Sequence, residues 1–244
     1  MAIKFPMALR VIGKSIRDWW DGWLDMVMMT ALWFFAQLTI VLGPPATFGV
    51  YYAINSSING QAMGVRGMIE GARKYFWKSL LWGLINWLVI ATFFVNFNFY
   101  ANVEAVWGLY LLVFVGLLAF LWVGTNFYGL AYFFIQEVRS LKVAFRNGIL
   151  TTLASPLYTL IILVPVVLIV GASIWVVLPL FLGLPAFIPM LGLRAVLERL
   201  ETFGLREREL TPKEIEMAES EKLHTPGLPR EDPQPEKKRS RWSR

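Results

Sequence analysis

The 244-residue chain is 57% hydrophobic and only 16% charged, whereas a soluble domain carries about 25% charged residues. It contains no cysteine and one histidine, His224, which excludes disulfides, thiolate metal sites and histidine-ligated metal or haem in a membrane, so no cofactor is expected. The net charge of +6 comes from bases that flank apolar stretches. This placement favours a membrane surface over nucleic acid as the partner.

Long stretches without Asp, Glu, Lys or Arg dominate the chain, at residues 26–65, 79–103, 105–136 and 147–193. Because about 20 apolar residues cross a bilayer as a helix, each stretch can hold one span and the largest can hold two. The sequence therefore predicts an all-α, polytopic transmembrane helical bundle. We expect an N-terminal amphipathic interfacial helix at 1–23, a transmembrane domain at 24–210 and a charged tail at 211–244.

The N-terminal segment has two faces at helical spacing. Leu9, Ile12 and Ile16 form an apolar stripe that continues through Trp19 and Trp23. The opposite stripe carries Arg10, Lys14 and Arg17. A helix of this kind lies in the headgroup layer, where tryptophans anchor it.

A first span is predicted at 24–42, ended by Pro44 and Pro45, which lack backbone donors. The next segment, 46–65, is apolar in its first half, but Asn55 and Asn59 make its second half a poor lipid-facing span. If this segment crosses the membrane, its polar side chains should face other helices or water.

Two basic amphipathic elbows each feed an apolar run. The first, at 65–78, carries Arg66, Arg73, Lys74 and Lys78, and the second, at 137–148, carries Arg139, Lys142 and Arg146. At an offset of about 72, Lys74 meets Arg146 and Ser79 meets Thr151. This resembles a weak internal repeat, and chance similarity of two amphipathic elbows is the alternative.

The remaining spans are predicted at 79–100, 106–136, 149–170 and 172–193. The second of these is about 45 Å long as one helix, so it must tilt, project or break. Its glycines at 108, 116 and 124 share nearly one face, which predicts a packed neighbour. Five prolines should kink or break the last two spans: Pro156, Pro165, Pro179, Pro185 and Pro189. Arg194 then leads into water, and the segment after residue 210 is too polar to fold.

Six spans place every basic segment on the cytoplasmic side and every base-free link outside, which satisfies the positive-inside rule. Both termini are then cytoplasmic. The alternative is five spans with 46–65 re-entrant, which places the N-terminal bases outside. The topogenic residues are thus the bases of the N-terminal helix and the two elbows, together with Arg194.

Four sequence blocks carry a resemblance to a known family: LW at 32–33, LGPPAT at 42–47, YY at 51–52 and YFWKSLLW at 75–82. In these blocks the chain resembles the YesL-like family of small bacterial integral membrane proteins. The resemblance implies an inner-membrane helical fold of five or six spans. It also implies an accessory role beside carbohydrate transport and degradation systems, and it supplies no catalytic residues. The charged tail departs from the family's compact ending, which leaves room for a chain-specific partner.

Apart from Asp25 at the start of the first, the predicted spans contain no Asp, Glu, His, Lys or Arg, so the chain is not expected to be an enzyme or to carry a proton relay. Amides in or beside the spans form a candidate lining for a polar solute: Asn55, Asn59, Asn86, Asn126 and Gln136. Interhelical hydrogen bonding is the alternative role for these amides. Three hypotheses follow: an accessory protein of solute transport, a small transporter working alone or as a homo-oligomer, and a subunit of a larger membrane complex.

Overall fold

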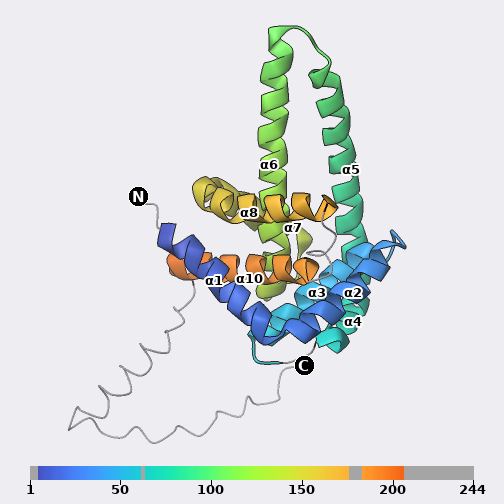
Figure 1. Ribbon diagram of the computed structural model, residues 1–244, viewed down its shortest axis with the longest axis vertical. Coiled ribbons are helices and arrows are strands. Elements are labelled where there is room, and N and C mark those ends of the chain that lie inside the picture. The colour runs from blue at the N-terminus through green and yellow to red at the C-terminus, as the bar shows by residue number, and fades with distance from the viewer. Residues whose placement is uncertain (1–4, 62–63, 176–182, 206–244) are drawn as a thin grey trace, which may run out of the picture.

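The computed structural model describes residues 5–61, 64–175 and 183–205, and every regular element within these ranges is an α-helix (Figure 1). The all-α prediction is therefore confirmed for this part of the chain. The predicted tail at 211–244 and Pro179 lie outside the described residues. The helices run in the order α1 (Phe5–Asp21), α2 (Trp23–Gln37), α3 (Gly43–Ile58), α4 (Gly64–Lys74), α5 (Phe76–Ala101), α6 (Val106–Ile135), α7 (Leu141–Ala154), α8 (Pro156–Trp175) and α10 (Leu184–Thr202).

Helices α5 and α6 form a long hairpin that projects from a base made by the other helices (Figure 1). They are 26 and 30 residues long, and both are apolar enough to cross a membrane. At 1.5 Å per residue they measure about 39 and 45 Å. The turn at their outer end contains Asn102 and Glu104, both exposed. These two candidate spans lie where the sequence predicted spans at 79–100 and 106–136.

A third candidate span is broken in the middle. Helices α7 and α8 pass the length and composition test together, but they are bent by 104°. Ser155 separates them with φ −142° and ψ 60°, and Pro156 begins α8. A residue before proline is disfavoured in the helical conformation, which accounts for the break. The segment predicted as one span at 149–170 is thus divided between two helices.

Helices α2 and α3 are 15 and 16 residues long, which corresponds to about 22 and 24 Å. Pro44 and Pro45 occupy the first turn of α3, where a missing N–H needs no acceptor. Both helices are shorter than the roughly 30 Å bilayer core. The structure thus contains two candidate spans, or three with the bent pair, in its described residues, and a six-span topology stays a prediction.

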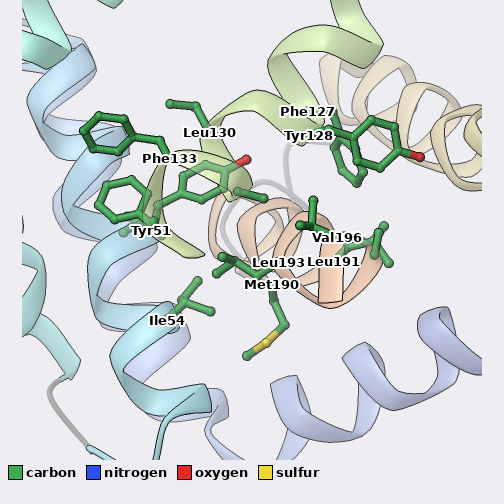
Figure 2. Close-up of a cluster of buried hydrophobic side chains, with 14 of the residues drawn as sticks. Tyr51, Ile54, Phe127, Tyr128, Leu130, Phe133, Met190, Leu191, Leu193 and Val196 are labelled. Carbon is green, nitrogen blue, oxygen red and sulfur yellow. The ribbon is translucent and has the colours of Figure 1, made fainter. Parts of the chain in front are cut away.

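The core lies where α3, the inner half of α6 and α10 meet (Figure 2). Tyr51 and Ile54 come from α3, Phe133 from α6, and Leu193 and Val196 from α10, and all five are buried. Within α6, burial is concentrated between Gly124 and Phe134. The first half of α6 instead exposes large apolar side chains. One continuous helix therefore contributes both to the packed base and to the projecting hairpin.

Each elbow helix packs against the helix before it, α4 against α3 and α7 against α6. Glycines allow the close approach: a Cβ at Gly49 would lie 2.2 Å from the Met68 carbonyl oxygen, and one at Gly148 would lie 2.5 Å from that of Thr125. A break then follows each elbow helix, at Tyr75 and at Ser155. These breaks are 80 positions apart, so an offset of 72 does not align them.

Replacing Gly49 with alanine should therefore separate α3 from α4. We expect the Gly49→Ala protein to lose about 1–3 kcal/mol of stability, because its Cβ meets backbone that cannot rotate away. Gly116→Ala is the matched control, since a Cβ there meets nothing within 4 Å. Thermal unfolding in detergent, followed by tryptophan fluorescence, compares the two. Equal midpoints would contradict the close packing.

Candidate functional site

A cavity of about 370 Å³ opens in the base, between α1, α2, α3, α10 and the start of α4. Its lining has two chemical characters. Met26, Met29, Ile54 and Met190 are buried and supply an apolar wall. The polar part of the lining comprises Asp18, Asp21, Asp25, Ser57 and Arg194.

An ion pair joins the first and last described helices at this cavity. Arg194 Nε donates to Asp18 Oδ2 at 2.7 Å, and Arg194 Nη2 lies 2.6 Å from the same oxygen. The Arg194 and Asp18 side chains are 14% and 25% exposed, so water screens the pair only in part. The pair therefore holds α1 against α10 at the wall of the cavity.

Asp25 lies against the backbone that begins α4. A Cβ on Gly64 would lie 2.8 Å from Asp25 Oδ1, and the φ of Gly64 is +43°. A carboxylate at a helix N-terminus is stabilised by the helix dipole. The cavity lining combines three carboxylates with one guanidinium, so it carries net negative charge. Such a lining suits a cation or a hydroxyl-rich solute that donates hydrogen bonds.

The two basic elbows meet within the base, at the C-terminus of α6. Lys78 Nζ donates to the Arg139 carbonyl oxygen at 2.6 Å. Arg139 Nη1 donates to the carbonyl oxygen of Phe133 at 2.9 Å and to that of Phe134. Arg139 therefore satisfies carbonyl groups in the last turn of α6 that have no partner within the helix.

Aromatic rings surround this junction. Lys74 Nζ lies 5.5 Å from the Tyr52 ring centroid and 5.6 Å from that of Tyr75. The Tyr52 hydroxyl donates to Glu70 Oε1 at 3.0 Å. Desolvation, and then this hydrogen bond, raise the pKa of Tyr52 above its ordinary value. The hydrogen bond links α3 to α4.

The other Lys and Arg residues predicted to set the topology lie on the outside of the packed helices. Arg10, Lys14 and Arg17 are on α1, Arg66 and Arg73 on α4, and Lys142 and Arg146 on α7, all with exposed side chains. Of the predicted helix-breaking prolines in the described part, Pro185 lies in the first turn of α10, and Pro189 lies inside that helix, which continues through it.

The amides predicted to line a solute site are spread over the molecule. Asn55 and Asn59 lie near the end of α3, and Gln136 follows α6. Trp122 Nε1 donates to Asn86 Oδ1 at 3.1 Å, and Asn126 Nδ2 donates to the Trp122 carbonyl oxygen at 2.9 Å. Asn86 thus links α5 to α6 through Trp122, whereas the Asn126 hydrogen bond lies within α6.

The carboxylates of the cavity were missed as a set by sequence reasoning. Asp18, Asp21 and Asp25 are spaced three and four residues apart, which places them on one side of a helix. That spacing was the available signal. Arg194 was singled out as a topogenic base, whereas the structure places it in the cavity wall.

Comparisons with protein-family models, with the curated proteins and with the solved structures find no match to this chain. Among the described residues, no group of three or more His, Cys, Asp or Glu side chains is arranged to hold a metal ion. The chemistry of the cavity therefore has to be judged from its own lining.

The ion pair between α1 and α10 can be measured with a double-mutant cycle. We expect Asp18→Asn and Arg194→Gln each to destabilise the protein, and the double variant to lose less than the sum of the two. The coupling free energy should be about 1–2 kcal/mol, which lies between the values typical of exposed and of buried ion pairs. Equilibrium unfolding in mixed micelles gives the free energies, and strictly additive effects would contradict the pairing.

Proposed function

We propose that the chain is a non-catalytic integral membrane protein of the bacterial cytoplasmic membrane that acts as an accessory or regulatory component of solute transport. The observation that carries the membrane part is the exposure of the α5–α6 hairpin. The most apolar windows of α5 and α6 are only 6% and 11% buried. Surface of this extent and composition needs a non-aqueous neighbour, and lipid provides it.

The distribution of charge supports the orientation. Both basic elbows lie at the base, where Lys78 contacts Arg139, and α1 joins α10 there through Asp18 and Arg194. The opposite end of the hairpin carries Glu104 and no Lys or Arg. Since Lys and Arg stay on the cytoplasmic side, we place the base and both termini there. The six-span arrangement is the version of this topology in which α2 and α3 also cross.

The link to carbohydrate transport rests on the resemblance to the YesL-like family. In this proposal the partner is a membrane transporter that the base contacts. The alternative, a structural subunit of a larger complex, shares this membrane placement, and the predicted charged tail would serve it as a docking arm.

A second candidate function, transport of a polar solute by this chain itself, is favoured by the cavity between α1, α2, α3 and α10. Its carboxylates can accept hydrogen bonds from a hydroxylated or cationic solute, while its methionine wall excludes water from one side.

The orientation is testable because the chain has no cysteine of its own. We expect Lys74→Cys and Lys142→Cys to react with a membrane-impermeant maleimide only from the cytoplasmic side, and Asn102→Cys only from the outside. Intact cells and inverted vesicles give the two measurements. Reaction of position 74 or 142 from the outside alone would reverse the proposed orientation.

The accessory and transporter functions separate in reconstituted liposomes. We expect liposomes that contain only this protein to show no counterflow of a labelled sugar, and mild extraction to recover the protein with a transporter. Counterflow by the protein alone that is lost in Asp21→Asn and retained in the control Glu104→Gln would replace the accessory function with the transporter. Recovery of the partner without residues 211–244 would exclude the tail as the docking arm.

A further inference from the structure

We infer that the turn between α2 and α3 is a membrane-inserted wedge: it enters the acyl-chain layer from the cytoplasmic side and returns to that side without crossing. The inference rests on the membrane placement proposed above. The turn comprises residues 38–42, and its four large apolar side chains are exposed: Leu38 by 69%, Ile40 by 69%, Val41 by 56% and Leu42 by 46%. Water is a poor neighbour for such a cluster.

The turn satisfies its own backbone donors, as lipid requires. The N–H of Thr39 donates to the Ala36 carbonyl oxygen at 3.2 Å, and that of Ile40 to the Gln37 carbonyl oxygen at 3.1 Å. The N–H of Val41 donates to the Thr39 carbonyl oxygen, and that of Leu42 to Thr39 Oγ1 at 3.3 Å. Pro44 and Pro45, which follow, have no N–H to satisfy.

Polar side chains near the turn are hydrogen-bonded within the α2–α3 hairpin. Gln37 Nε2 lies 3.5 Å from the Gly43 carbonyl oxygen, and Trp33 Nε1 donates to Thr47 Oγ1 at 3.0 Å. Thr39 Oγ1 donates to the Ala36 carbonyl oxygen at 2.7 Å. The polar groups of the tip therefore have partners inside the α2–α3 hairpin, and the exposed side chains of the turn other than Thr39 are apolar.

The two ends of α3 show opposite chemistry. The loop after α3 contains exposed Asn59, Gly60 and Gln61, and Gly60 supplies the positive φ of +80°. The turn before α3 gives the positive φ, +52°, to Ile40, although a β-branched residue rarely adopts it. Glycine or asparagine is usual at such a position in water. The turn therefore keeps an apolar side chain where a hydrated loop would not.

The position of the turn beside α5 indicates that lipid surrounds its exposed side chains. A Cβ on Gly83 would lie 2.5 Å from Pro44 Cγ, and the Phe48 and Trp82 rings are 5.8 Å apart. Gly83 is five residues beyond Lys78, the last base before the apolar run, which is about 8 Å along the helix. The segment that follows the turn thus packs against α5, whose exposed side chains just beyond this contact, such as Leu84 and Trp87, are apolar. Because α2 and α3 are too short to cross, the wedge returns to the side from which it came.

Single-cysteine variants at the two ends of α3 test this inference. We expect Val41→Cys to react with a membrane-impermeant maleimide from the cytoplasmic side at least tenfold more slowly than Gln61→Cys, and not to react from the outside. An NBD fluorophore at position 41 should be quenched by lipids that are spin-labelled on the upper acyl chain, and one at position 61 should not. Leu38→Cys repeats the measurement should the Val41→Cys protein fail to fold.

Each other outcome overturns the wedge. Reaction of position 41 from the outside would show that α2 and α3 cross, and fast reaction from the cytoplasmic side would place the turn in water. Protection without quenching by lipid would show that protein covers it. Failure of Asn102→Cys to react from the outside would instead count against the proposed orientation, because the quenching at position 41 does not depend on that result.

Discussion

A helix with apolar side chains on all sides satisfies its own backbone but needs neighbours that are not water, and this constraint governs the molecule. In α5 and the outer half of α6, the described part of the chain supplies few such neighbours, so the side chains are left to lipid. The inner half of α6 is different, because α3, α7 and α10 cover it. The boundary between these two environments lies near Gly124, where the packed base begins.

The base is organised by the charges that the membrane excludes. Lys78, Arg139 and Lys74 gather where the long helices leave the apolar layer, over the rings of Tyr52, Tyr75, Phe133 and Phe134. This arrangement gives each cation an aromatic or carbonyl partner while its head stays near water. On the other side of the base, Asp18 neutralises Arg194 and leaves two further carboxylates along the cavity. A part of the molecule that is rich in Lys and Arg thus also contains a locally acidic hollow.

Much of the helical plan was predictable, because it depends on local properties. Charge-free length predicted α5 and α6, and Pro156 predicted the break that separates α7 from α8. Tertiary contacts were not predictable from spacing: of the glycines at 108, 116 and 124, only Gly124 meets a neighbouring helix, through Thr152, whereas Gly116 faces open space. The amides predicted to line a solute site do not lie together, because the partner of each one is set by how the helices pack. The cavity was missed because Asp18 and Arg194 are 176 residues apart, and only the closure of α10 on α1 brings them together.

The continuity of α6 has a consequence for biosynthesis. The ribosome delivers α3 and then α6 well before α10, yet the buried faces of Tyr51 and Phe133 lie in a cluster that α10 completes. Until residues 184–202 emerge, those faces lack the helix that completes their cover. In the membrane placement proposed above, the hairpin therefore meets the bilayer before α10 can close the base.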